Sequence, residues 1–374
     1  MLKLQGLHFT MENDTQPNCF TFSEDWYQQQ LLVGFWIEGV AVSVVAILGI
    51  LGNMLAMTVF TRKKMRNSFN LLLVALACFD AMYLFGAIFG AIFGAMGHFG
   101  LSTDTHTILY PYFLYPLQSI VFSASIFMIV SIAIERYTVV CQPQKYAEAM
   151  LEKHAVAKRL LKYVGAVTIL ALVLSVNKFF EVKLVMIEDI KFIGITELRS
   201  HPTYSKVSQW TSVILTGVIP FVLLICLYTK IVLEVKNRKM SHAEEIGESE
   251  EGGETVAFQM TEMSTAEQLP PCTSRIAKNH IKEEDKLAMI FLAIVIVFFI
   301  CHLPRLILSI HETFMIDDFL ECSKAGKTPF GMWRFMLVYI SHLFIVISSA
   351  INFPIYTCLS PKFRQECRKL LKCC

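Results

Sequence analysis

Long apolar runs, nearly free of charged residues, alternate with short polar connections along most of the chain. Seven runs have about the 20 residues that a helix needs to cross the hydrocarbon core of a bilayer. They are Phe35–Phe60, Phe69–Met96, Ile108–Ile134, Leu161–Asn177, Val207–Tyr228, Leu287–Leu308 and Phe335–Leu359. The fourth run is the shortest. We therefore expect an all-α fold, a bundle of seven transmembrane helices.

The polar segments divide the chain into an N-terminal segment at 1–34, a seven-helix domain at 35–359 and a basic tail at 360–374, expected to form a short cytosolic helix. Acidic and small residues predominate between 240 and 275, which predicts a disordered loop within the domain. The N-terminal segment lacks the continuous apolar stretch of a cleavable signal peptide. We therefore expect the first helix to act as the insertion signal.

One internal repeat, in which Phe-Gly-Ala recurs every four residues, lies in the second apolar run. It places Gly86, Gly90 and Gly94 on one helix face. Small residues at this spacing allow neighbouring helices to approach closely. We therefore predict a packing function for this face rather than a contact with a ligand.

Composition narrows the class of protein. Hydrophobic residues make up 55 % of the chain and charged residues 17 %, so most of the surface is expected to contact the lipid bilayer. A formal net charge of +2 gives no reason to expect a nucleic-acid partner. The chain has no zinc-type Cys pair, phosphate-binding glycine loop or His-Glu-x-x-His motif. We expect neither an enzyme nor a tightly bound cofactor.

The distribution of basic residues predicts the orientation. Lys and Arg are concentrated in the first and third connections and in the tail, which places these segments in the cytosol and the N-terminus outside the cell. We therefore expect a multi-pass protein of the plasma membrane. Asn13 then lies in an exposed glycosylation sequon, although such triplets also occur by chance.

Two groups of cysteines suggest covalent modification. Cys19 and Cys322 fall outside the cell in this topology, where a disulfide is favoured, although both could stay free or Cys19 could pair between chains. Cys367, Cys373 and Cys374 lie in the basic tail, a setting typical of palmitoylation as well as of free thiols.

A charged residue inside a transmembrane run costs several kcal/mol unless it has a partner. Asp80 lies within the second run, and Asn53, Ser125 and Asn352 are polar groups that we expect at a similar depth. The four predict either a water-filled polar cluster that could hold a sodium ion or a packed group of mutual hydrogen bonds.

The third run ends in Glu135-Arg136-Tyr137. Gln118 precedes Arg136 by 18 residues, which is five helical turns, so both side chains should face the bundle interior. Glu284 has the same spacing from His302 in the sixth run. We predict that Glu135 and Glu284 hold Arg136 at the cytosolic ends of the helices.

Several motifs resemble those of rhodopsin-like receptors coupled to G-proteins. They are Glu135-Arg136-Tyr137, Leu76-Ala77-Cys78-Phe79-Asp80, Phe298 with Cys301-His302-Leu303-Pro304, Asn352-Phe353-Pro354-Ile355-Tyr356, and the pair Pro220 and Tyr228. Within that family the chain is most similar to invertebrate FMRFamide-type neuropeptide receptors, as in Met65-Arg66-Asn67-Ser68-Phe69-Asn70. The resemblance implies a heterotrimeric G-protein partner, with Tyr228 and Tyr356 moving against Arg136 on activation.

The sequence also departs from the family pattern. The family's usual disulfide between the outer end of the third helix and the second extracellular loop cannot form, because neither that end nor the loop from Glu181 to Lys206 contains a cysteine. His302 replaces the family's sixth-helix tryptophan. The proline of the seventh-helix motif is displaced by one position, to Pro354.

The absence of certain residues reduces the number of possible ligand classes. In the family that the chain resembles, amine receptors carry an Asp in the outer part of the third helix, and light-sensing members carry a Lys in the seventh. Here no carboxylate occurs between Ile108 and Ile134, and Val346 occupies the position of that Lys, which argues against an amine ligand and against an opsin. The remaining expectation is an extracellular peptide. Its predicted cavity is lined by Tyr115, Gln118, Glu181, Trp210, Arg305, Ser309, Glu312, Tyr339 and His342.

For a ligand ending in Arg-Phe-amide, Glu312 or Glu181 would pair with the guanidinium. Arg305 would donate to peptide carbonyls or pair with a neighbouring carboxylate. A receptor for a lipid or other small molecule is the first alternative. A transporter is the second, and it would place its polar groups at mid-membrane rather than at the two ends.

Overall fold

The computed structural model describes residues 19–21, 23–92, 104–152, 154–187, 190–251, 271–324 and 327–373. Its elements are α1 (Glu24–Gly34), η1 (Phe35–Ala41), α2 (Val42–Phe60), α3 (Ser68–Gly90), α4 (Asp104–Leu109), η4 (Tyr110–Leu114), α5 (Tyr115–Cys141), α6 (Pro143–Met150), α7 (Ala155–Ser175), η5 (Val176–Phe180), β1 (Val182–Ile187), β2 (Ile190–Ile195), α8 (Glu197–Ser200), α9 (Pro202–Ser212), η6 (Val213–Val218), α10 (Ile219–Glu251), α11 (Pro271–Phe314), α12 (Ile316–Lys324), α13 (Met332–Ala350), α14 (Asn352–Leu359) and α15 (Pro361–Cys373).

Seven helical stretches of the described chain are long and apolar enough to cross a membrane, which confirms the predicted bundle. They are Glu24–Phe60, Ser68–Gly90, Thr105–Cys141, Ala155–Phe180, Pro202–Arg238, Lys286–Phe314 and Met332–Ala350. Several extend beyond the apolar runs because polar residues continue the helix past the expected membrane edge. The first, for example, begins 11 residues before Phe35, at Glu24, where the Ser23 hydroxyl accepts a hydrogen bond from the Trp26 amide.

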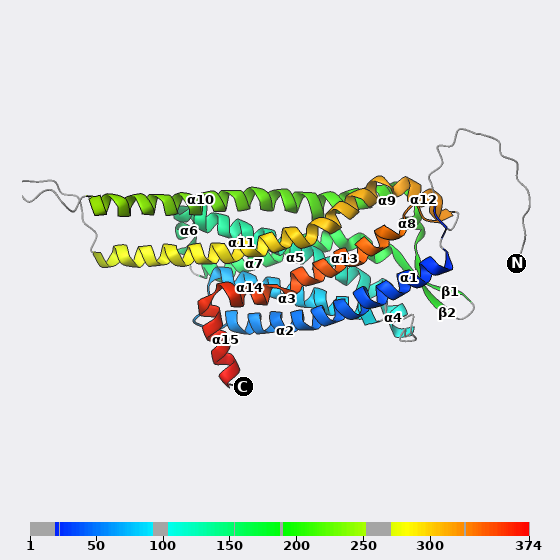
Figure 1. Ribbon diagram of the computed structural model, residues 1–374, viewed down its shortest axis with the longest axis horizontal. Coiled ribbons are helices and arrows are strands. Elements are labelled where there is room, and N and C mark those ends of the chain that lie inside the picture. The colour runs from blue at the N-terminus through cyan, green and yellow to red at the C-terminus, as the bar shows by residue number, and fades with distance from the viewer. Residues whose placement is uncertain are drawn as a thin grey trace, which may run out of the picture.

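The long helices lie side by side along one axis (Figure 1). The strands β1 and β2 lie at one end of the bundle, here called the hairpin end, and α15 lies at the other, the α15 end. Helix α5 occupies the middle of the bundle, since it packs against α3, α7, α10 and α11. The third and sixth transmembrane stretches therefore meet inside the bundle.

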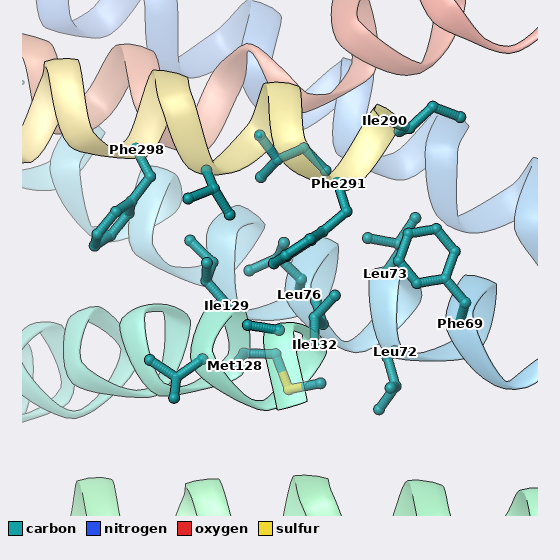
Figure 2. Packing of buried hydrophobic residues seen from close by; sticks show 14 of the residues in the cluster. Phe69, Leu72, Leu73, Leu76, Met128, Ile129, Ile132, Ile290, Phe291 and Phe298 are labelled. Atoms are coloured by element: carbon teal, nitrogen blue, oxygen red, sulfur yellow. The ribbon is translucent and has the colours of Figure 1, made fainter. Parts of the chain in front are cut away.

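A continuous apolar core fills the region where α3, α5 and α11 meet (Figure 2). Leu76 of α3, Met128 of α5 and Phe291 of α11 are each no more than 1 % exposed. The outward faces of the helices are apolar as well. Leu48, with 64 % of its surface exposed, and Ile169, with 65 %, project away from the core. Such faces suit lipid rather than water.

Glycine permits one close helix contact that the sequence analysis missed. A methyl group added at Gly49 in α2 would lie 2.6 Å from the Ala350 side chain and 2.9 Å from its Cα. In the predicted glycine face, a methyl at Gly86 would overlap the Gln118 amide at 1.9 Å, but one at Gly90 would meet nothing within 4 Å. Gly94 lies outside the described residues. At the two described positions of the repeat, glycine therefore makes room for a side chain at Gly86 and for no close contact at Gly90.

Two features differ from the predicted organisation. Helix α10 continues to Glu251 and α11 begins at Pro271, so helix occupies both ends of the loop predicted as disordered at 240–275. Ala, Glu and Met are strong helix formers, which explains the extension of α10. Residues 252–270 lie outside the description. The segment after the fourth transmembrane stretch also forms an antiparallel hairpin, with Val182 paired to Ile195, where the sequence indicated only a loop.

Candidate functional site

A cavity of about 780 Å³ opens between α1, α3, α5, α11 and α13 at the hairpin end. Five of the predicted cavity residues line it: Tyr115, Gln118, Arg305, Tyr339 and His342. Tyr339 accepts a weak hydrogen bond from Gln30, at 3.4 Å, so the N-terminal helix α1 forms part of the wall. The cavity thus lies closer to the first and seventh transmembrane stretches than the sequence analysis expected.

Four of the predicted residues do not line this cavity. Glu312 forms an ion pair with Arg334 at 2.8 Å, and the Ser309 carbonyl accepts a hydrogen bond from the Thr313 hydroxyl. Trp210 contacts the ring of Phe314 edge-on and borders a separate hollow that is lined by residues of α9 and η6. The sequence therefore placed these three side chains in the cavity wall, whereas the structure places them outside it.

Glu181 is the fourth, and it forms the centre of a polar cluster. Only 3 % of its surface is exposed, and its carboxylate accepts hydrogen bonds from the Lys178 ammonium at 2.8 and 2.9 Å and from the Tyr115 hydroxyl at 2.8 Å. The Tyr204 hydroxyl donates at 3.2 Å, and Arg199 lies 3.9 Å away. The cluster therefore joins the third transmembrane stretch to the hairpin segment and to α9.

The same neighbours set the protonation of Glu181. Burial by itself raises the pKa of a carboxyl group, but Lys178, the Tyr115 hydroxyl and Arg199 together lower the pKa of Glu181 below its ordinary value of 4.5. The carboxylate is consequently charged at neutral pH. The hydrogen bond between Tyr115 and Glu181 links the third transmembrane stretch to the segment after the fourth. Rhodopsin-like receptors usually join these two segments by the disulfide that cannot form here.

One pair in the cavity wall was not predicted. Glu38 in η1 lies 2.6 Å from the Nδ1 atom of His342 in α13, and both side chains line the cavity. The sequence did contain a signal for this pair, because Glu38 is a carboxylate inside the first apolar run and such residues are functional candidates by default. By the same rule Asp80 was predicted as a functional residue from the sequence, whereas Glu38 was not.

Asp80 is buried between three transmembrane stretches. Its two carboxylate oxygens accept hydrogen bonds from the Ser125 hydroxyl at 2.5 Å and from the Asn352 amide at 2.8 Å. Asn53 was expected to join them, but its amide donates instead to the Ser349 carbonyl of α13, at 2.9 Å. Three of the four predicted residues therefore meet, and the fourth links the first and seventh stretches beside them.

The α15 end of the bundle contains the Glu135-Arg136-Tyr137 motif, and Glu135 has two partners that the sequence did not predict. The buried Glu135 carboxylate accepts hydrogen bonds from the Ser68 hydroxyl at 2.8 Å and from Arg159 at 2.5 Å. Arg159 of α7 therefore contacts the Glu135 carboxylate, for which the sequence predicted Arg136 as the partner. The Arg136 guanidinium lies 4.2 Å above the centre of the Phe69 ring and is 2 % exposed.

The other predicted switch residues differ in burial and in the residues that they contact. Tyr356 is 1 % exposed and packs edge-on against Phe60, with ring centres 5.0 Å apart. Tyr137 and Tyr228 are partly buried beside the apolar core, and Lys230 lies 5.6 Å from the Tyr137 ring. The side chain of Glu284 lies outside the described part of the chain.

His302 completes an aromatic stack across the middle of the bundle. Its ring lies 4.2 Å from the ring of Phe298 and 6.0 Å from that of Phe122 in α5, nearly parallel to both. Pro304 lies one half-turn further along α11. The imidazole therefore occupies a packed position between the third and sixth stretches, where the family pattern has an indole.

The structure joins Cys19 and Cys322 in a disulfide with a Cα separation of 5.6 Å. Phe20 and Thr328 also exchange two backbone hydrogen bonds, so the N-terminal segment is held against the α12–α13 connection. In the tail, Cys367 is buried against the bundle, a position that disfavours the predicted palmitoylation there. The side chains of Cys373 and Cys374, and Asn13, lie outside the described residues.

Comparison with known proteins agrees with this architecture. The family model for 7-transmembrane receptors of the rhodopsin family matches residues 52–356. The FMRFamide receptor of Drosophila melanogaster is 28 % identical over 369 residues, which cover 94 % of this chain and 57 % of that protein. The FMRFamide peptide receptor frpr-18 of Caenorhabditis elegans is 32 % identical over 28 % of this chain and 24 % of its own length.

A third relative is the neuromedin-U receptor 1 of Mus musculus, which is 24 % identical over 88 % of this chain and 72 % of its own length. The chain spans less than two thirds of the length of the first two relatives.

Proposed function

Because the chain belongs to the rhodopsin family of seven-transmembrane receptors, we propose that it binds an amidated, FMRFamide-like neuropeptide and activates heterotrimeric G-proteins. The observation that carries this proposal is the similarity to the Drosophila FMRFamide receptor over 94 % of the chain, together with a ligand-sized cavity. The chain is a multi-pass membrane protein. Its family is one of receptors rather than of enzymes.

The proposed orientation places the hairpin end outside the cell and the α15 end in the cytosol. The excess of Lys and Arg in the connections at the α15 end supports this orientation. The disulfide between Cys19 and Cys322 supports it as well, since disulfides form in the oxidising lumen through which the extracellular face passes. The plasma membrane is the location where such a receptor meets a secreted peptide.

The cavity has the size and chemistry of a site for the end of a peptide. Small-ligand cavities measure roughly 300–1,000 Å³ and combine apolar walls with a few polar groups. The wall here contains Tyr110, Tyr115 and Tyr339 beside Arg305. No hydrogen bond or ion pair of Arg305 occurs within the described part of the chain. Its guanidinium is therefore available to donate to a carbonyl oxygen of the ligand.

Signalling requires two states whose populations the ligand shifts. A peptide in the cavity contacts α11 through Arg305, one residue after Pro304. Proline interrupts the helical hydrogen-bond ladder and permits bending there. Outward movement of the α15 end of α11 would expose the buried Arg136 to the G-protein.

Asp80 is proposed to bind a sodium ion. Oxygen ligands suit such a cation, and the Asp80 carboxylate and the Ser125 hydroxyl, 2.5 Å apart, supply them. Asn352 instead points its amide nitrogen at Asp80, so it would have to turn its carbonyl oxygen to join the set.

The proposal is tested by agonist-dependent nucleotide exchange on G-protein in membranes that contain the receptor. A panel of amidated peptides, including some that end in Arg-Phe-amide, is compared with the same peptides as free acids. We expect exchange with a subset of the amidated peptides and little with the acids. Exchange driven by lipids or other small molecules, with no response to any peptide, would overturn the neuropeptide assignment.

A further inference from the structure

We propose that Glu38 binds the cationic group of the ligand and thereby selects peptides with a basic residue near the amidated end. This inference rests on the proposed function, since it assigns one contact within the same cavity. It replaces the two carboxylates that the sequence suggested for this contact. Three observations lead to Glu38.

First, permanent cations already pair with the other two carboxylates. Glu312 lies 2.8 Å from the Arg334 guanidinium, which also lies 3.7 Å from the Phe330 ring centre. Glu181 receives both of its shortest ionic contacts from Lys178. Neither residue lines the cavity. A ligand guanidinium would have to displace an ammonium or guanidinium of the receptor to reach either one, with little gain in charge interaction.

Second, the partner of Glu38 is an imidazole rather than a permanent cation. His342 contacts one oxygen of Glu38 through Nδ1, and no hydrogen bond to the other oxygen occurs among the described residues. Imidazole carries charge only when it is protonated, whereas a guanidinium carries charge at all physiological pH values. A ligand guanidinium therefore brings a positive charge that a neutral His342 lacks. The second carboxylate oxygen of Glu38 can accept a hydrogen bond from that guanidinium.

Third, the opposite charges of the cavity wall lie on different helices. Glu38 lies on η1 and Arg305 on α11, and these are the acidic and the permanently basic side chains in the described wall. Arg305 repels a cation and favours a carbonyl oxygen, so the two residues give the ligand one direction. Both side chains of the Glu38–His342 pair are also partly sheltered, with 18 % and 31 % exposed. Partial burial strengthens the interaction with a ligand charge.

The test is a double-mutant cycle between receptor and ligand. Competition binding in membranes measures the affinity of an amidated peptide ending in Arg-Phe-amide. It also measures the analogue in which citrulline, an uncharged isostere, replaces arginine. We expect the wild-type receptor to prefer the arginine peptide by at least about tenfold, since close charge pairs at interfaces couple by that much or more. Glu38→Gln should remove most of this preference by weakening the arginine peptide alone.

Glu312→Gln is the matched control, because it neutralises a carboxylate at the same end of the bundle but outside the cavity. It should keep the tenfold preference. If Glu38→Gln fails to reach the cell surface, Glu38→Asp is used, and its shortened carboxylate should reduce the preference severalfold without changing the affinity for the citrulline peptide. An unchanged preference in the Glu38 variant would overturn the inference.

The same measurements separate this inference from the proposed function. A wild-type receptor that binds arginine and citrulline peptides equally contradicts the assignment of Glu38 but leaves a peptide receptor intact. A wild-type receptor that reaches the surface and binds none of the amidated peptides contradicts the proposed function, and the inference falls with it.

Discussion

Replacing Glu181 with glutamine should destabilise the hairpin end of the receptor by about 2–3 kcal/mol. Each hydrogen bond to a buried charged group contributes roughly 1.5–3 kcal/mol, and breaking a buried ion pair costs roughly 3–5 kcal/mol. Glutamine keeps the length of the side chain but offers one acceptor oxygen to Lys178, Tyr115 and Tyr204 together. We expect a loss at or below the lower end of the range for a buried ion pair, because the Lys178 side chain is 21 % exposed and can turn toward water.

Thermal unfolding of the purified receptor in detergent measures this effect. We expect the midpoint of unfolding to fall by about 5 °C at pH 7. The matched control is Glu152→Gln, which removes an ion pair with Lys158 whose side chains are both 60 % exposed. Exposed pairs contribute about 0–1 kcal/mol, so the control should change the midpoint by little.

Acid should erase the difference between the wild type and Glu181→Gln. The pKa of Glu181 in the folded receptor lies below the ordinary value of 4.5, so its charge stabilises the fold above that pH. The contribution is lost as the pH falls through the lowered pKa. The gap between the two midpoints should therefore shrink below pH 4.5. Equal midpoints at pH 7, or a gap that widens in acid, would refute the reasoning.

Three further outcomes are expected. Arg136→Ala should abolish agonist-driven nucleotide exchange while surface expression stays within about twofold, and an Arg136→Ala receptor that signals normally would contradict the proposed switch. Cys19→Ser and Cys322→Ser should each lower stability by about 2–5 kcal/mol, and the double variant should lose no more than either one, as two ends of one bond must. Gly49→Ala should destabilise the bundle by about 1–3 kcal/mol through overpacking against α13, whereas Gly90→Ala, with open space around it, should be neutral or stabilising in the same unfolding assay.

The bundle was predictable because insertion into a membrane depends on local composition. A run of apolar residues such as Phe69–Met96 can satisfy its backbone in lipid only as a helix, whatever the rest of the chain does. The disulfide followed from topology in the same way, since only Cys19 and Cys322 were expected at one face. Motif spacing also placed Asp80 at the depth of Ser125 and Asn352, which the structure brings into hydrogen-bond contact.

Charge pairing was harder to predict, because several groups of opposite sign compete for each partner. Glu135 had Arg136 beside it in the sequence, yet the carboxylate is taken by Arg159 of α7 and by Ser68. Adjacent residues on a helix point about 100° apart, so neighbours in sequence are poor partners for one another. Helices that pack beside α5 supply better-placed groups.

The sequence by itself determined that the chain forms seven membrane-spanning helices with a buried carboxylate at Asp80 and a charged motif at one end. Only the tertiary structure decided which carboxylate lines the cavity at the hairpin end. Glu38 and His342 are separated by 304 residues and meet because α13 packs against η1 and α2. Glu181 and Glu312, which are equally acidic, lie outside the cavity and form ion pairs with Lys178 and Arg334. Whether a segment forms a membrane helix depends on its own hydrophobicity, which is a property of the sequence. The choice among ionic partners depends instead on which helices lie within a few ångströms of each other.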